Sequence, residues 1–482
     1  MSDSLPVSES PLSTNTVAST NTATNAATCA CICTVNGPFS ILDRVSKLIG
    51  LESILQRIFP AIYMQILSLA YFLVQKGLPL SRAETWSTSH KHPFGNALPS
   101  QRVSELLHAI TESDRQAFFS AWMAHLAETE CFVYDITSVS SYSVGNEYVC
   151  WGYNRDGEKL PQINMAMLYG QGSGLPAYYR RLPGNISDVS TLQTTINSLN
   201  FIGQCALTFV MDRGFYSKTN INALLNANYN FVIACPKRKW VEELFEKHHD
   251  ELLEYQNSRI LENDEVMYMI TKQYQWDEHM CYAHIYFSNV KAAEEKDKFA
   301  RKLAKWKNEL KMHAERDENE WAYKKYFVVT ETAEEGRIVS ENNEAINAEM
   351  KKQTGFFCIL TKQKMDAAEI LDLYRKKECV ENCFDDLKNT LDMKRLRMHS
   401  SAAADAKMFL QFIAAIILSK IRAIKNQDST LKNMSIREIM EAMETISEIK
   451  LPNSGNTMFT ETGKIQREIA KTFGVNHETW LQ

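Results

Sequence analysis

Two aspartates stand in the same sequence context, at the ends of short apolar runs that are typical of buried strands. Asp135 and Asp212 are each followed by small or turn-forming residues. Ligands of α/β proteins gather at the carboxyl ends of strands, and two carboxylates there could hold a hard divalent cation such as Mg²⁺. Each aspartate alone could equally cap the turn that follows it. The neighbours Arg213 and Gly214 favour a ligand site, because glycine permits close approach of the backbone and arginine binds phosphate.

A third candidate carboxylate, Glu381, lies in a segment with helical periodicity, Met365–Leu391. At 100° per residue, Lys377, Glu381 and Lys388 fall within about 60° of Tyr374, so the four side chains form one stripe. A carboxylate flanked by cations and a tyrosine suits a metal ligand whose neighbours bind a phosphate backbone.

The same stripe is also explained by a solvated helix face with an ion pair between Lys377 and Glu381. Glu378 and Asp385 lie near the stripe, so periodicity does not choose among the three acids. Other chemistries find little support, since the sequence has no P-loop, no H-E-x-x-H zinc motif and no G-x-S-x-G nucleophile motif.

The segments that would position these residues alternate between strand and helix patterns, which indicates a mixed α/β fold. The expected strands are Cys131–Asp135, Asn164–Tyr169, Pro176–Arg181, Ala206–Met211, Asn230–Cys235 and Gly355–Thr361, with a helix over Thr191–Leu199. Between the last two strands, Glu265–Ile270 and Cys281–Phe287 are strand-like, and Lys291–Lys325 is dense in both charge signs and predicts a long solvated helix.

Changes of composition along the chain predict its division into regions. Before the core, residues 36–128 have a helical period, and they could bind DNA through a helix-turn-helix-like unit or serve only for packing. The full division is a disordered Ser/Thr-rich tail over 1–35, the helical N-terminal domain over 36–128, a first core part over 129–236, an insertion domain over 237–353, a second core part with the Glu381 helix over 354–425, and a helical C-terminal region over 426–482.

Composition narrows the class of protein further. The 482 residues carry 53 Lys and Arg against 58 Asp and Glu, a net charge of −5, which excludes a strongly basic polymer-coating protein but not a nucleic-acid enzyme. The longest apolar runs, Ala61–Val74 and Met408–Leu418, are short for a bilayer, so no membrane partner is expected. Eleven scattered cysteines and no Lys or Arg in the first 43 residues predict a cytoplasmic protein without a targeting signal.

The ordered set of motifs resembles the DDE transposases of bacterial insertion sequences, in the subgroup with a Y-(2)-R-(3)-E-(6)-K signature. Tyr374, Lys377, Glu381 and Lys388 reproduce that spacing, with lysine where the pattern has arginine and Arg375 close by. The other matching segments are Tyr134-Asp135-Ile136-Thr137-Ser138, Gly152-Tyr153-Asn154-Arg155-Asp156, Leu182-Pro183-Gly184-Asn185-Ile186-Ser187-Asp188 and Met211-Asp212-Arg213-Gly214-Phe215-Tyr216-Ser217.

The resemblance implies an RNase H-like catalytic core that is interrupted by an insertion domain, with phosphoryl transfer at DNA as its reaction. It implies Asp135, Asp212 and Glu381 as ligands of two Mg²⁺ ions, with Mn²⁺ as a substitute. The residues implied in DNA binding are Tyr374, Lys377, Lys388, Arg213 and Arg375. The implied partners are the terminal inverted repeats of the element and its target DNA, bound by a homodimer in a bacterial cytoplasm. A stand-alone nuclease on the same core and a catalytically silent DNA-binding derivative are the alternatives.

Overall fold

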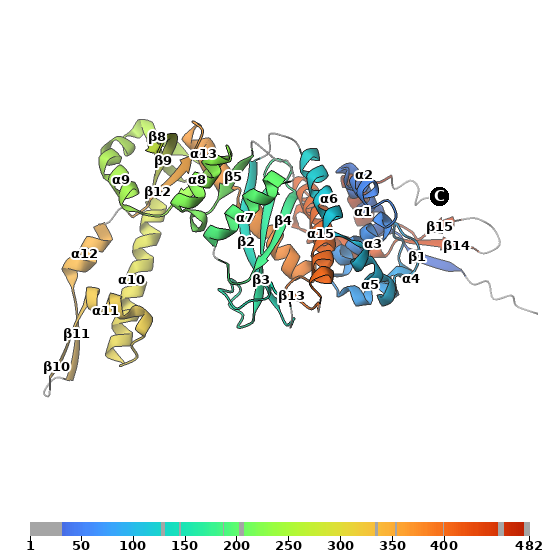
Figure 1. Ribbon diagram of the computed structural model, residues 1–482, viewed down its shortest axis with the longest axis horizontal. Coiled ribbons are helices and arrows are strands. Elements are labelled where there is room, and N and C mark those ends of the chain that lie inside the picture. Colours follow the sequence, from blue (N-terminus) through green and yellow to red (C-terminus); the bar gives the residue numbers. More distant parts are fainter. Residues whose placement is uncertain are drawn as a thin grey trace, which may run out of the picture.

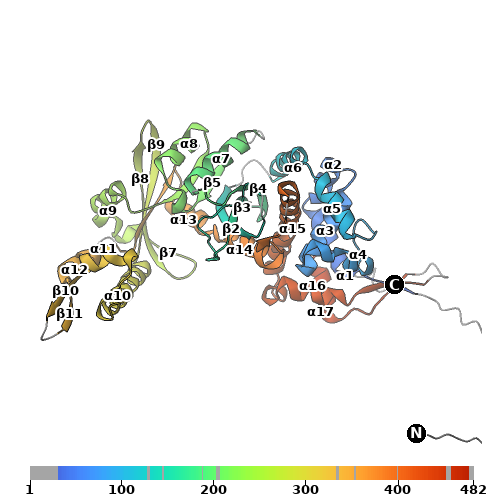
Figure 2. The same ribbon diagram turned by 60° about the horizontal axis from the view of Figure 1, so that its bottom comes forward.

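The computed structural model describes residues 31–126, 131–143, 146–186, 188–201, 207–332, 336–351, 354–398, 400–451 and 457–476. The molecule is elongated (Figures 1 and 2), with a helical end, a large mixed sheet in the middle and a small projecting unit at the other end. This mixed α/β architecture confirms the expected fold class.

One half of the sheet has the strand order β4-β3-β2-β5-β6. Strands β2, β3 and β4 form an antiparallel meander, and β5 and β6 run parallel to β2. Strands β3 and β5 are buried along almost their whole length, as expected for a sheet covered on both faces. The elements of this half are β2 (Cys131–Ser141), β3 (Gln162–Gly170), β4 (Pro176–Pro183), α7 (Asp188–Phe201), β5 (Thr208–Met211), α8 (Lys218–Asn226) and β6 (Asn230–Cys235).

The other half of the sheet corrects the expectation that 237–353 stays outside it. Strand β12 (Phe356–Thr361) pairs with β6, so the chain leaves and returns where the sequence predicts. However, β9 (His279–Ser288) pairs with β12, β8 (Val266–Trp276) with β9, and β7 (Ser258–Ile260) with β8. The first part of 237–353 therefore extends the same sheet, because the far edge of β12 offers unpaired backbone groups to β9. Helix α9 (Lys239–Leu252) packs on β8 and β9.

The rest of 237–353 forms the projecting unit with a hydrophobic cluster of its own. Helix α10 (Asn289–Lys311) carries Leu303, Trp306 and Leu310 on the stripe that packs into this cluster. The predicted continuous helix to residue 325 ends at Lys311, and α11 (Glu320–Tyr326) follows after a break. The unit is completed by the hairpin of β10 (Phe327–Thr332) and β11 (Gly336–Glu341) and by α12 (Asn343–Lys351).

The N-terminal helices pack around α15 (Ser401–Gln427), and together with the sheet they share one continuous hydrophobic core. Helix α15 is long and apolar enough to cross a membrane, although the apolar run recognised in the sequence, Met408–Leu418, is shorter. In the structure, 83% of the most apolar stretch of α15 is buried inside the protein. The N-terminal helices are α1 (Gly37–Leu48), α2 (Leu51–Ile58), α3 (Tyr63–Lys76), α4 (Ala83–Ser89), α5 (Ser100–Ala109) and α6 (Glu112–His125).

A small second sheet shows that the predicted tail over 1–35 and the predicted helical region over 426–482 were each partly wrong. Strand β1 (Ile32–Val35), which falls in the predicted tail, pairs with β14 (Ser447–Lys450), and β14 pairs with β15 (Thr457–Phe459). The β-branched residues of β1 suit a strand. The C-terminal region is therefore mixed rather than helical, since the two strands lie between α16 (Ile436–Glu444) and α17 (Lys464–Thr472). The predicted tail over residues 1–30 lies outside the described residues.

Candidate active site

Strand pairing brings Asp135 and Asp212 to neighbouring positions. Tyr134 of β2 pairs with Met211 of β5 in parallel register, so the next residue along each strand is an aspartate. Asp212 directly follows β5, as predicted, and a 3₁₀ turn begins after it. Asp135, in contrast, does not end its strand, because β2 continues to Ser141 and pairs with β3 along this length.

The helical side of the site also differs from the prediction. Instead of one helix over 365–391, α13 (Ala367–Arg375) ends before Lys377, and α14 (Glu378–Asp385) begins after it. A π-helical turn, Asp386–Thr390, follows α14. Lys377 therefore lies at the junction of the two helices. Its ammonium group is close to two carboxylates, those of Asp212 and Glu381.

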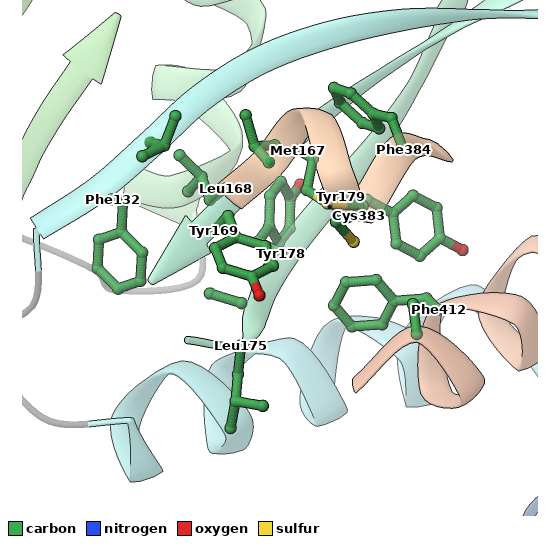
Figure 3. Packing of buried hydrophobic residues seen from close by; sticks show 14 of the residues in the cluster. Phe132, Met167, Leu168, Tyr169, Leu175, Tyr178, Tyr179, Cys383, Phe384 and Phe412 are labelled. Atoms are coloured by element: carbon green, nitrogen blue, oxygen red, sulfur yellow. Dashed lines mark hydrogen bonds between the residues drawn. The ribbon is translucent and has the colours of Figure 1, made fainter. Parts of the chain in front are cut away.

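Buried contacts fix α14 against the sheet and α15. Cys383 lies 3.7 Å from the sulfur of Met167 on β3, and Figure 3 shows Cys383 and Phe384 among the aromatic side chains of this core. Beyond α14, the buried Asp386 carboxylate is ion-paired with Arg422 of α15. These contacts fix the helix that carries Glu381, whose exposed side chain lines the same hollow as Asp135 and Asp212.

Charged contacts join the helix junction to Asp212. The Tyr374 hydroxyl donates a hydrogen bond of 2.7 Å to Asp212, and the Lys377 ammonium lies 3.6 Å from Asp212 and 3.7 Å from Glu381. Burial raises the pKa of Asp212, but the Tyr374 hydrogen bond, Lys377, and the amide and charge of Arg213 together outweigh it and hold the pKa below its ordinary value. Burial and the Asp212 charge raise the pKa of Tyr374 well above its usual value, so the phenol stays a donor.

Asp135 lies in a less compensated environment. Burial raises its pKa to about 6; the Ile136 amide, which donates a hydrogen bond of 2.8 Å to the carboxylate, lowers it, as do Arg155 and Lys377, while the charge of Glu381 raises it. Asp135, Asp212 and Glu381 line one hollow of about 610 Å³, together with Arg155 and Lys388.

The comparison with protein families identifies the domain that contains this hollow. A model described as "Transposase DDE domain" matches residues 127–417, which is more than half of the chain. The chain belongs to the DDE transposase domain family.

Two further comparisons complete this result. Among solved structures, the cryo-EM structure of the piggyBac transposase synaptic complex with hairpin DNA is similar at 9% sequence identity and a TM-score of 0.38, over 84% of this chain and 70% of that chain. Comparison with curated proteins gives no match.

In this DDE transposase, the remaining predicted residues divide between two hollows that share Asp212. Lys388 lines the hollow of the three acids and binds both carboxylate oxygens of Asp156 at 2.7 Å. Arg213, Tyr374 and Arg375 instead line a neighbouring hollow bounded by β8, β9 and β12. There, Arg375 forms an ion pair of 3.0 Å with Glu265.

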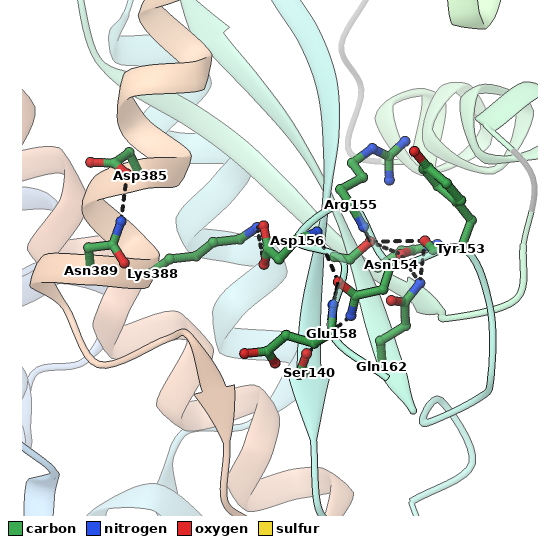
Figure 4. A network of polar contacts seen from close by, with 12 residues as sticks. Ser140, Tyr153, Asn154, Arg155, Asp156, Glu158, Gln162, Asp385, Lys388 and Asn389 are labelled. Atoms are coloured by element: carbon green, nitrogen blue, oxygen red, sulfur yellow. Dashed lines mark hydrogen bonds and ion pairs between the residues drawn. The ribbon is translucent and has the colours of Figure 1, made fainter. Parts of the chain in front are cut away.

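Sequence reasoning missed the loop between β2 and β3 as a part of the site. Figure 4 shows Asp156 turned toward Lys388, while Asn154 accepts hydrogen bonds from the backbone amides of Asp156 and Glu158. The loop carries one of the segments by which the chain resembles insertion-sequence transposases, which is the only signal that could have found it. Polar side chains of β2 hold the loop, including Ser140, which accepts a hydrogen bond of 3.1 Å from Asn154.

The donor set of the hollow fits a hard divalent cation in its chemistry, because carboxylate oxygens are the ligands that Mg²⁺ prefers. Within the described ranges, no three His, Cys, Asp or Glu side chains are gathered tightly enough to hold a metal as they stand. The Lys377 ammonium lies between Asp212 and Glu381, where a divalent cation would also be attracted. The elevated pKa of Asp135 is likewise what a buried carboxylate shows before a cation compensates it.

Proposed function

We propose that this DDE transposase cleaves the ends of an insertion sequence and joins them to target DNA, and that it belongs to the subgroup with the Y-R-E-K signature. The observation that carries the proposal is the meeting of Asp135, Asp212 and Glu381 at one hollow, although Asp212 and Glu381 come from opposite sides of a long insertion. Lys377 and Tyr374 of the signature both contact Asp212, which lines this hollow and the neighbouring one.

Asp135, Asp212 and Glu381 would hold the divalent cations, Mg²⁺ or in its place Mn²⁺. When bound, two such ions would activate water and then the freed 3′-hydroxyl for in-line attack on a phosphodiester. The chain's own contribution is positioning: Asp135 is fixed by strand pairing and by the Ile136 amide, and Tyr374 orients the Asp212 carboxylate.

Cations around the hollow would bind the DNA backbone. Lys377 and Lys388 each contact an acidic side chain in the DNA-free protein, so phosphates would compete with carboxylates for them. Arg213 and Arg375 line the neighbouring hollow and would contact DNA on the other side of Asp212. Phosphate neutralisation is the expected role for all four, because the reaction needs charge stabilisation more than a covalent nucleophile.

The partners that this activity requires are the terminal inverted repeats of the element and a target duplex. A homodimer on DNA would bring two element ends together, since each active site acts on one end. A bacterial cytoplasm is the compartment that we propose for this reaction.

The test is incubation of the purified full chain with labelled DNA that carries the inverted repeats flanking its own gene, in Mg²⁺. Joined products support the transposase. Cut products without joining would indicate a stand-alone nuclease, and a shifted but intact band would indicate a DNA-binding protein without chemistry. A Glu381→Gln variant in parallel shows whether any cleavage belongs to this hollow or to a contaminant.

A further inference from the structure

The loop between β2 and β3 exposes aromatic side chains beside the candidate catalytic hollow. Tyr153 is 85% exposed and Trp151 is 69% exposed, although rings of this size normally bury most of their surface. Arg155, two residues further on, lines the hollow with Asp135. Figure 4 shows the Tyr153 and Arg155 side chains on the same side of the loop, so the exposed ring stands next to a side chain that lines the hollow.

The exposure of Tyr153 does not come from a loosely held loop. Its carbonyl oxygen accepts hydrogen bonds from Gln162 at 2.8 Å and from Ser138 at 3.4 Å. The preceding residue, Gly152, packs so closely on Gly184 that an added Cβ would lie 2.1 Å from the Gly184 carbonyl oxygen. The backbone is therefore fixed by its neighbours while the ring is left in solvent, an arrangement that suits a ligand with a flat apolar face.

We propose that Tyr153 stacks on an unpaired base of the DNA end next to the cleaved phosphate. The inference rests on the proposed function and adds a base contact to it. Stacking needs a free π-face, which bases inside a duplex do not offer to a side chain from outside, so the ligand is a single-stranded nucleotide. Arg155, on the same side of the loop, would bind the phosphate of that nucleotide.

The experiment measures DNA binding by the full chain in EDTA, so that no cleavage takes place. The probes are a blunt element-end duplex, the same duplex with a two-nucleotide single-stranded extension at the cleaved end, and that duplex with abasic nucleotides in the extension. Tyr153→Ala and Tyr153→Phe are compared with the wild type. Tyr255→Ala is the matched control, because Tyr255 is 90% exposed but lies next to β7, at the far edge of the sheet.

The wild type, Tyr153→Phe and Tyr255→Ala are expected to bind the natural extension about 5- to 100-fold more tightly than the abasic one. Tyr153→Ala is expected to lose this difference while it still binds the blunt and abasic duplexes as the wild type does. The abasic probe separates base stacking from phosphate contact, because it keeps the backbone charge and removes only the π-face.

Two results would overturn the inference: equal binding of natural and abasic extensions by the wild type, or an equal loss for all three probes in Tyr153→Ala. The second result would point to backbone contacts or to an interface between two copies of the chain. A protein that cleaves element ends in Mg²⁺ without this base dependence would keep the proposed function and reject only the stacking. A protein that binds none of the three probes would reject both.

Discussion

The two sides of the candidate catalytic hollow are built in different ways. On the strand side, Asp135 is largely buried and is fixed by backbone pairing, with its pKa raised to about 6. On the helix side, Glu381 is exposed, follows a break between two helices and shares the Lys377 ammonium with Asp212. The strand side thus holds a carboxylate at a cost in stability, whereas the helix side holds one that is solvated and lies beside an ammonium group. A bound cation should therefore affect mainly the stability of the protein through Asp135 and mainly the rate of cleavage through Glu381.

The largest expected effect is on the chemistry and comes from the helix side. Glu381→Gln should lower cleavage by about three orders of magnitude or more, because loss of one ligand charge removes several kcal/mol of transition-state stabilisation. DNA binding should stay the same or become slightly tighter, since one negative charge near phosphate is lost. Cleavage and binding assays on one preparation measure both effects.

The matched control is Glu378→Gln, which alters an acid of the same first turn of α14 that does not line the hollow within the described residues. It should cleave at nearly the wild-type rate. If Glu378→Gln is inactive while Glu381→Gln still cuts, the signature has been aligned to the wrong acid.

A stability effect is expected next, on the strand side. The folded pKa of Asp135 lies above the ordinary aspartate value, so the folded state binds its proton more tightly and the wild type loses stability as the pH rises from about 4 to 6. In EDTA at pH 8, Asp135→Asn should therefore be more stable than the wild type by about 1–3 kcal/mol, and this advantage should disappear near pH 4.

Mg²⁺ should stabilise the wild type at pH 8 and leave Asp135→Asn almost unchanged, because a cation compensates only a charged carboxylate. Denaturant unfolding with and without Mg²⁺ measures both parts. Equal stabilisation of the two proteins by Mg²⁺ would mean that Asp135 is not a ligand.

A smaller effect concerns the Lys377 ammonium. Lys377→Gln should increase the affinity of the DNA-free protein for Mn²⁺ by about 3- to 10-fold, because a positive charge beside Asp212 and Glu381 is removed. Lys376→Gln is the control, since Lys376 pairs with Asp372 at 2.7 Å on the exposed side of the junction. Titration calorimetry measures the Mn²⁺ affinity of both variants. If neither Lys377→Gln nor Lys376→Gln changes this affinity, the cation binds away from Lys377.

The smallest effect is expected for the pair of Lys388 and Asp156. Lys388→Ala should weaken DNA binding by about 2- to 5-fold and reduce its salt dependence by about one phosphate contact. Asp156→Asn should do the reverse and tighten binding, because it releases the lysine.

The exposed pair of Lys218 and Asp277 has a similar contact, of 2.8 Å, on a different surface and supplies matched controls, Lys218→Ala and Asp277→Asn. Binding measured over a range of salt concentrations should show no change in their slope. The role of Lys388 would be excluded if its variant behaved as the Lys218 variant does.

The sequence predicted the parts of the site that depend on local pattern. Asp212 follows β5, and the strands β6 and β12 lie on either side of 237–353 as expected, because apolar runs with clear ends determine them. The length of β2 could not be predicted, because a polar run beginning at Thr137 suggests a turn, while β3 and the following loop satisfy it in the structure.

Long-range contacts account for the rest. No proline or glycine marks the break at Lys377, and helical periodicity continues through it. The contact of Lys388 with Asp156 joins residues that are 232 positions apart, and the extension of the sheet by β9 depends on a free strand edge. Local composition shows that 281–287 is strand-like, but it does not show which residues pair across such distances.

The most direct test of the central claim, that Asp135, Asp212 and Glu381 hold one metal centre, is backbone cleavage by Fe²⁺ bound in place of Mg²⁺. With ascorbate and peroxide, the wild type is expected to break near all three residues, and Mg²⁺ in excess should suppress all three breaks together. In Asp135→Asn the breaks near residues 212 and 381 should weaken as well, although the sequence there is unchanged. Breaks near one acid only, or breaks near 212 and 381 that persist in Asp135→Asn, would contradict the account.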